Sequence, residues 1–308
     1  MKRKIIQMAG KTMLVSLPSS WVKKYGVKKG EEVEVEEQDR RIIISTEKSF
    51  SEIKGELDLN KFDKLAKRTI GAYYKYGCDE IKIIFRKPDD IKLVEKVLNE
   101  LLGFEIVSHN EKFCIIKEVS SGEKSEFDAM IRRMFLVVSS ISDDCLEGLR
   151  KSDYNQLKDI EQRDVTVNRL ANFCRRLLNK EGYSDFRKAP MIYYILEEVE
   201  NLGDEYKYLC DFVTKNHIKI QNKKILDSLA EINTLFKEFS SVYNKFESKK
   251  AEQIYAKKEE IMQGMNNLFK TKSVEEVRVL DYMTRMVIII SNMLGPLMTM
   301  ELPQKDFD

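Results

Sequence analysis

The chain has 308 residues, of which 43% are apolar and 34% are charged, and its 53 Lys and Arg nearly balance its 51 Asp and Glu. This length predicts two or three domains, and the apolar fraction suffices for buried cores, which excludes disordered and fibrous proteins. The five cysteines are widely spaced and form no C-x-x-C pair, which indicates free core thiols in a reducing cytosol and argues against a thiolate zinc site.

Positive charge is concentrated at the start of the chain, because residues 1–30 hold eight Lys or Arg and no Asp or Glu. Cations beside short strands suit a surface that follows phosphates, since neutralising phosphates and releasing their counterions supplies most non-specific affinity for nucleic acid. The alternative is a small β module with a solvated basic face. The residues predicted to contact DNA, chiefly through phosphates, are Arg3, Lys4, Lys11, Lys23 and Lys24.

Short alternating apolar runs predict a compact β-rich unit at residues 1–48. Pro18 cannot donate to a sheet ladder and therefore marks the end of a strand. Ser19 or Ser20 can cap the short helix that follows, and Gly26 can end it. The expected elements are strands at 5–8 and 13–17, a helix at 20–25, and a hairpin of strands at 32–36 and 41–45 across Gln38-Asp39-Arg40.

Two motifs of this unit resemble the AbrB/SpoVT family of DNA-binding domains. They are G-K-T-M-L-V-S-L-P-x-x-W at residues 10–21 and V-x-K-G-E-x-V-x-V at residues 27–35. In that family the strands of two chains interleave into one small swapped-hairpin β-barrel, so the resemblance implies a homodimer. A unit of this size with few large apolar side chains would also be marginally stable alone.

Two segments invite comparison with targeting or membrane sequences. The basic residues 2–4 precede apolar ones, but Lys11 interrupts any apolar core, which argues against a signal peptide. The apolar run Met286–Met298 is broken by Gly295-Pro296 and is too short to cross a bilayer. We therefore expect a cytoplasmic protein without a membrane span.

Residues 56–120 predict a small α/β module, which follows a polar connector at residues 50–59. The module contains neither G-x-G-x-x-G nor G-x-x-x-x-G-K-[ST], so nucleotide binding has no support. Its histidine, His109, is expected at a hairpin turn. A ligand-sensing role and a plain spacer role both remain open. The expected elements are helices at 60–76 and 89–101 and strands at 80–86, 104–108 and 112–119.

From Gly122 onward every long segment has the broad apolar stripe of a packed helix. Three such segments precede the link at residues 216–222 and three follow it, which indicates an internal duplication. The helical domain, 123–302, would thus consist of two three-helix units, 123–216 and 222–302. The expected helices are 123–150, 153–179, 189–216, 222–246, 248–269 and 273–294.

Two helices of the first unit carry acidic side chains on one face, at spacings i, i+3 and i+7. Stacked carboxylates repel one another unless a cation lies between them, and oxygen ligands on facing helices commonly bind metals in helical bundles. The alternative is a solvated charged face. The candidate metal ligands are Glu161, Asp164 and Asn168 on one helix and Glu197, Glu200 and Asp204 on the next.

Both segments resemble the E-x-x-x-D segments of the PhoU family. They read E-Q-R-D-V-T-V-N-R-L-A-N-F-C-R-R-L-L at residues 161–178 and Y-I-L-E-E-V-E-N-L-G-D-E-Y at residues 194–206. Members of that family are duplicated three-helix bundles that bind metal clusters and regulate phosphate uptake. The resemblance implies a divalent metal or an iron cluster in the first unit, although Asn168 stands where the family has a carboxylate.

The second unit departs further from the PhoU pattern. Arg285 follows Asp281 by four residues and Gly264 follows Glu260 by four, so neither segment completes a pair of carboxylates. We predict a helical salt bridge between Asp281 and Arg285. At most one metal site is therefore expected, in the first unit.

The two resemblances together predict a cytoplasmic transcriptional regulator similar to the PhoU-type phosphate-uptake regulators of archaea. Its expected partners are double-stranded DNA, a second copy of the chain, and a phosphate transporter or a sensor kinase. Only two histidines are present, which argues against di-iron and triad enzymes, and we expect no enzymatic activity. The alternatives are an adaptor that regulates a transporter or kinase by protein contact alone, and a metal-dependent carboxylate protein for storage or oxidation.

Overall fold

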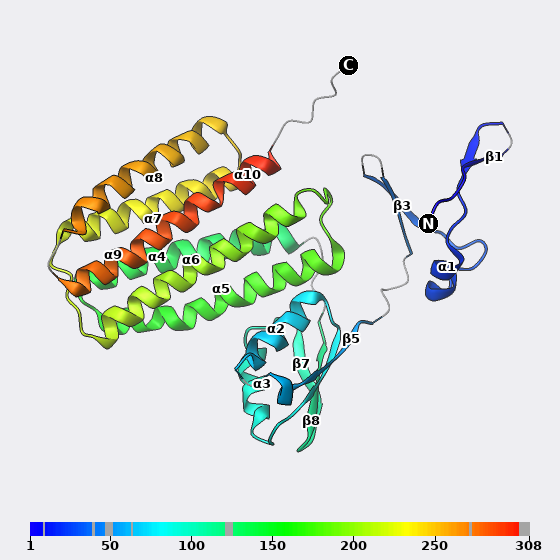
Figure 1. The fold of residues 1–308 in the computed structure, drawn as a ribbon, viewed down its shortest axis with the longest axis horizontal. Helices are drawn as coiled ribbons and strands as arrows, with labels where there is room; N and C mark the ends of the chain where they lie inside the picture. Colours follow the sequence, from blue (N-terminus) through cyan, green and yellow to red (C-terminus); the bar gives the residue numbers. More distant parts are fainter. Residues whose placement is uncertain are drawn as a thin grey trace. The chain divides into compact units, whose positions relative to one another are not determined.

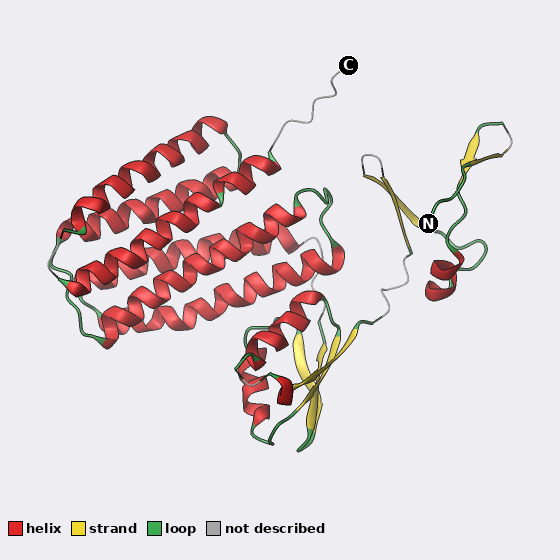
Figure 2. Cartoon of the chain, viewed as in Figure 1, coloured by secondary structure: helices red, strands yellow, loops and turns green. Residues whose placement is uncertain are grey.

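The computed structural model describes residues 1–8, 10–38, 41–46, 52–62, 64–120, 126–270 and 273–301. The chain divides into two compact units, Met1–Ile53 and Lys54–Asp308. The first contains short β-hairpins, and the second a four-stranded sheet and long helices (Figure 1, Figure 2). The predicted multidomain fold is confirmed at this level. The predicted boundaries at residues 48, 123 and 302 and the predicted turn at Asp39-Arg40 lie outside the described residues.

The first unit has the predicted order of strand, strand, helix and hairpin. Strands β1 (Ile6–Met8) and β2 (Thr12–Leu14) pair antiparallel, as do β3 (Glu34–Gln38) and β4 (Arg41–Ser45). The second strand was predicted to reach Leu17 but ends at Leu14, because Leu14 pairs with Ile6, where β1 begins.

Helix α1 (Ser19–Tyr25) lies between the two hairpins. The predicted serine cap is wrong, because Pro18 occupies the N-cap position and makes no side-chain bond there. The predicted end at Gly26 is confirmed. Gly26 has a φ of 61°, in the left-handed region that glycine tolerates, and its N–H bonds to the carbonyl of Val22.

The α/β module is a mixed sheet in the order β5-β6-β8-β7. Strand β5 runs parallel to β6, and the other pairs are antiparallel. Helices α2 and α3 connect the strands, and a short 3-10 turn, η1 (Leu59–Lys61), follows β5. The elements are β5 (Lys54–Asp58), α2 (Ala66–Tyr76), β6 (Glu80–Ile84), α3 (Asp90–Leu98), β7 (Phe104–His109) and β8 (Phe113–Glu118).

Strand β5 was missed in the sequence, where a polar connector was expected. Its only large apolar residue is Leu57, because β5 is an edge strand with one partner. The predicted helix at 60–76 was also wrong at its start. Asp58 accepts a hydrogen bond from the N–H of Asn60, which lies in η1, and α2 begins only at Ala66.

The helical part contains the six predicted long helices and the short α10 (Leu294–Met300). Asp153, Asn222 and Ser273 accept backbone N–H bonds at the N-caps of α5, α7 and α9, which fixes where these helices begin. The long helices are α4 (Phe127–Lys151), α5 (Tyr154–Glu181), α6 (Ala189–Lys215), α7 (Lys223–Asn244), α8 (Ser248–Leu268) and α9 (Val274–Asn292).

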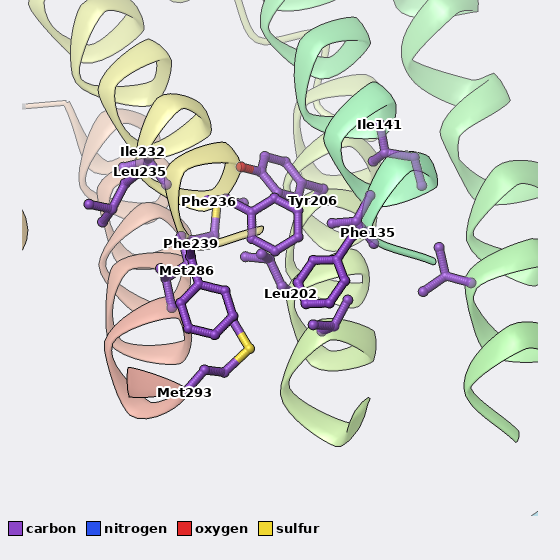
Figure 3. Close-up of a cluster of buried hydrophobic side chains, with 14 of the residues drawn as sticks. Phe135, Ile141, Leu202, Tyr206, Ile232, Leu235, Phe236, Phe239, Met286 and Met293 are labelled. Carbon is purple, nitrogen blue, oxygen red and sulfur yellow. The ribbon is translucent and has the colours of Figure 1, made fainter. Parts of the chain in front are cut away.

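The two three-helix units share one apolar core. Figure 3 shows side chains of α4 and α6 meeting those of α7 and α9. Phe135 of α4 stacks on Phe236 of α7 with ring centroids 5.7 Å apart. The Tyr206 hydroxyl donates to Asn233 Oδ1 at 2.8 Å, and Asn233 Nδ2 donates to the carbonyl of Ser142 at 2.6 Å, so buried polar groups also join α6, α7 and α4. All five cysteines are buried, as predicted for core positions.

The segment Val274–Met300 is the one helix among the described residues that is long and apolar enough to cross a membrane by composition. One face of this segment packs in the bundle. The apolar residues buried there include Val279, Leu280, Met283, Met286, Val287 and Ile290. Core packing accounts for these residues, whereas Val274, Ile288 and Met298 of the same segment are exposed.

The α/β module is attached to the bundle by a buried arginine of α5. Arg176 is 1% exposed, and its Nη1 donates to the carbonyls of Tyr74 at 2.9 Å and Cys78 at 2.7 Å. Its guanidinium lies over the rings of Tyr74 and Phe104, at 5.1 and 4.9 Å from their centroids. Nη2 donates to Asp79 and Glu118, which Lys180 of α5 also contacts. The module and the bundle therefore belong to one compact unit.

Candidate functional site

The five predicted DNA-contacting cations are all exposed on the N-terminal unit. Arg3 and Lys4 precede β1, and Lys11 lies in the turn between β1 and β2. Lys23 and Lys24 lie in the last turn of α1, where the carbonyl end of a helix attracts positive charge. The Lys24 ammonium is 5.1 Å from the centroid of the Tyr25 ring. The structure thus leaves every one of these cations accessible to a phosphate.

The described residues of the N-terminal unit form no buried core in a single chain. None of its residues 1–8, 10–37, 41–46 and 52–53 is buried. Large apolar side chains are instead exposed on both hairpins, with Ile6 at 59%, Met13 at 64% and Ile42 at 66%. Exposed apolar surface on this scale is typical of an interaction surface.

Five of the six residues predicted to bind metal lie between α5 and α6, around basic side chains of the same two helices. Lys207 Nζ donates to Asp164 Oδ2 at 2.7 Å and also contacts Asp204. Asn168 Nδ2 donates to the same Asp164 oxygen at 3.1 Å. Asp164 is only 2% exposed, so these contacts compensate a charge that is almost fully removed from water.

A second group of contacts surrounds Arg175 of α5, which is 2% exposed. Its Nη1 donates to Glu197 Oε1 at 2.8 Å, and its Nη2 lies 3.8 Å from Glu200 Oε2. Glu161, the remaining predicted ligand, is exposed to solvent. The structure therefore separates the six candidates into a group at Lys207, a group at Arg175, and Glu161.

Burial dominates the electrostatics of this acidic region. It raises the pKa of Glu200 to about 7, because the charged carboxylate loses hydration, and the nearby Arg175 only partly reverses the effect. Burial also raises the pKa of Asp164, against the hydrogen bond and charge of Lys207. The charged form of Lys207 is favoured in turn, since its hydrogen bonds to Asp164 and Asp204 raise its pKa despite its own desolvation.

As they lie, these residues do not fit a metal ion. The ammonium of Lys207 and the guanidinium of Arg175 lie where a metal would have to meet the carboxylates. Within the described residues, no group of three or more His, Cys, Asp or Glu could hold a metal ion. Asp164 Oδ1 and Asn168 Oδ1 are buried without a hydrogen-bond partner, but two oxygens fall short of the roughly six that hard cations require.

The second three-helix unit also has a basic side chain where the family pattern would have a ligand. The predicted helical salt bridge is confirmed, because Arg285 Nη1 donates to Asp281 Oδ2 at 2.7 Å. Arg285 Nε also donates to Glu205 Oε2 of α6 at 2.9 Å. Glu205 was not predicted to take part.

Lys207 and Arg175, the two residues that organise the acidic region, were not predicted from the sequence. A signal was present for each, since Lys207 follows Asp204 by three residues and Arg175 follows Asn168 by seven, so each shares a helix face with a predicted ligand. The stacked carboxylates do require a cation between them, but only a metal was expected in that role.

The N-terminal segment matches a known family model. Residues 6–52 match the model described as antidote-toxin recognition MazE, a bacterial antitoxin. A search of curated protein sequences found no match. This match supports the prediction that the N-terminal domain is of the DNA-binding MazE/AbrB type.

The helical part matches a solved structure, that of the phosphate transport system regulatory protein PhoU from Streptococcus pneumoniae. The TM-score is 0.50 and the sequence identity 18%, and the match covers 58% of this chain and 94% of that chain. At this identity the comparison shows the fold. The predicted fusion of a MazE/AbrB-type domain with a PhoU-like helical domain is confirmed.

Proposed function

We propose that this protein is a DNA-binding transcriptional regulator of phosphate uptake. The observation that carries the proposal is the exposure of Arg3, Lys4, Lys11, Lys23 and Lys24 on a MazE/AbrB-type unit whose first 30 residues contain no acid. Clustered exposed cations attract phosphates, which supplies affinity and register on DNA.

A homodimer built on the N-terminal unit is part of the proposal. Two-stranded hairpins are marginally stable alone in water, and here no described residue of the unit is buried. A second copy would cover Ile6, Met13 and Ile42 and would give both hairpins the core that one chain lacks. Two copies would also double the number of cations presented to one DNA duplex.

The PhoU-fold bundle is proposed to receive the signal through a protein partner, such as a phosphate transporter or a sensor kinase. The Streptococcus pneumoniae protein is described as a regulator of the phosphate transport system. We extend this role to the present chain because the two proteins share a fold. A partner controls DNA binding only if it binds the DNA-competent and incompetent states with different affinity.

The α/β module would transmit such a change. Its first strand, β5, begins at Lys54, directly after the N-terminal unit in the chain, and Arg176 holds the module to α5 of the bundle. The module is therefore better placed to transmit a shift of α5 than a flexible spacer would be.

The test is binding of the full-length protein to its own upstream DNA and to unrelated DNA of equal length, at two salt concentrations. Preference for the upstream DNA that survives the higher salt supports the regulator. Absence of binding at either concentration supports instead an adaptor that acts by protein contact alone. If both DNAs bind with equal, salt-sensitive affinity, the N-terminal unit binds DNA without sequence preference, which contradicts sequence-specific regulation.

A further inference from the structure

We propose that the acidic face between α5 and α6 is neutralised by the chain's own Lys207 and Arg175, and that the folded protein binds no metal ion or cluster there. The inference concerns the bundle alone and holds whether or not the N-terminal unit binds DNA. It reverses what the PhoU resemblance implies for these residues.

Lys207 acts at one end of the face. Its ammonium contacts one carboxylate from each helix, Asp164 of α5 and Asp204 of α6. A bridging metal would use the same two carboxylates and the same space between them. Because the side chain of Lys207 is only 18% exposed, the ammonium is held at this position by packing as well as by charge.

Arg175 acts further along the face. It is almost fully buried and reaches Glu197 and Glu200 of α6. Burial lowers the pKa of Lys75 of the α/β module, and the charges of the same two glutamates act against this change and favour its cationic form. Three basic side chains thus compensate the four carboxylates of this face, which are those of Asp164, Asp204, Glu197 and Glu200. Little negative charge remains that a metal cluster could compensate.

The second unit repeats the arrangement with different residues. Arg285 of α9 joins Asp281 of its own helix to Glu205 of α6. A guanidinium therefore bridges two helices where the metal-binding pattern would have a carboxylate. Two independent places in the bundle thus use a basic side chain in the role of the bridging cation.

The proposal predicts that loss of Lys207 creates a cation site. Without its ammonium, Asp164 of α5 and Asp204 of α6 would have no cation between them. The unpaired oxygens of Asp164 and Asn168 would add neutral or charged ligands on the α5 side. A divalent cation could then bind where the ammonium had been.

The experiment measures metal content and thermal unfolding of the full-length wild type and of Lys207→Met, with Mn²⁺ as the probe. After incubation with Mn²⁺ and dialysis, the wild type should retain substoichiometric metal, and its melting temperature should not depend on Mn²⁺. Lys207→Met should melt lower without Mn²⁺ and recover about 5 °C at a Mn²⁺ concentration near 100 times its dissociation constant.

Two further variants define the site. Lys215→Ala removes another lysine of α6, one that pairs with Asp211 at the surface, and should behave as the wild type. Adding Asp164→Asn to Lys207→Met should abolish the response to Mn²⁺.

Retention of one or more metal ions per chain by the wild type would overturn the proposal, even if Lys207→Met failed to fold. A folded Lys207→Met protein whose melting temperature ignored Mn²⁺ would also count against it.

Discussion

Arg176 and Glu118 form one of the buried charged contacts through which the bundle holds the α/β module. Arg176 Nη2 of α5 donates to Glu118 Oε2 of β8 at 2.8 Å, and the two residues are 58 positions apart in the chain. The arginine side chain is 1% exposed and that of the glutamate 15%. Because both charges are largely removed from water, they need compensation. Arg176 obtains it from Glu118, Asp79 and the carbonyls of Tyr74 and Cys78, and Glu118 obtains it from Arg176 and Lys180.

Replacing Arg176 should therefore loosen the module. Arg176→Met keeps much of the apolar stem but leaves Glu118, Asp79 and the carbonyls of Tyr74 and Cys78 without this donor. We expect a decrease of about 3 kcal/mol in unfolding free energy, as for other broken buried ion pairs. Urea unfolding measures the decrease. Relative to the wild type, the rate of backbone hydrogen exchange should increase more in α2 and β8 than in α7.

The matched control is Lys82→Met, which breaks a half-exposed ion pair with Glu56 in the same sheet. It should change the unfolding free energy by less than about 1 kcal/mol. Equal decreases in the two variants would mean that burial of Arg176 has no special role.

The cations of the N-terminal unit should determine the salt dependence of DNA binding. Replacing Lys11 or Arg3 with Ala should weaken binding to any DNA sequence and lower the salt slope by roughly one for each phosphate that is no longer neutralised. Fluorescence anisotropy over a series of salt concentrations gives the slope. Lys237→Ala, which removes a lysine of the bundle that pairs with Asp143, is the control and should leave the slope unchanged. An unchanged slope for Lys11→Ala would contradict its assignment as a phosphate-binding residue.

The exposed hairpins should hold two chains together. Ile42→Asp places a carboxylate where the proposed dimer buries an apolar side chain that is 66% exposed in one chain. We expect a monomer at concentrations at which the wild type is a dimer, measured by light scattering after size-exclusion chromatography. Val274→Asp, at a residue of α9 that is 78% exposed, should remain a dimer. A wild-type monomer would contradict the swapped-hairpin assembly directly.

Sequence periodicity was sufficient for the long helices and the order of domains, because their apolar stripes follow from local spacing. It failed at β5, where pairing with β6 decides the structure of a mostly polar segment. No role was predicted for the adjacent Arg175 and Arg176. Neighbouring residues on a helix point about 100° apart, so one reaches α6 and the other the α/β module, and both are buried. The spacing from Asn168 could have placed Arg175 on the face toward α6, but only the packing of α5 against the α/β module reveals the role of Arg176.

The last prediction concerns the dependence of stability on pH in the α/β module. Asp90, at the start of α3, is 3% exposed and accepts hydrogen bonds from the backbone N–H and the guanidinium of Arg86. The side-chain hydrogen bond from Arg86 is the largest cause that lowers the pKa of Asp90 below its usual value, against the opposing effect of burial. A carboxyl with a lowered pKa in the folded state stabilises the protein above its unfolded pKa of about 3.9, and this contribution is lost as the pH falls through the folded pKa.

Asp90→Asn should therefore cost about 2 kcal/mol at pH 7, because hydrogen bonds to charged groups contribute on this scale. The difference from the wild type should narrow below about pH 4, as Asp90 itself becomes protonated. Urea midpoints at pH 7 and pH 3 test both statements. Asp89→Asn is the matched control, since the neighbouring Asp89 has a side chain that is 68% exposed and forms a surface ion pair with Lys92. If the two variants lost equal stability at pH 7, the buried contact between Asp90 and Arg86 would contribute no more than the surface pair of Asp89 and Lys92.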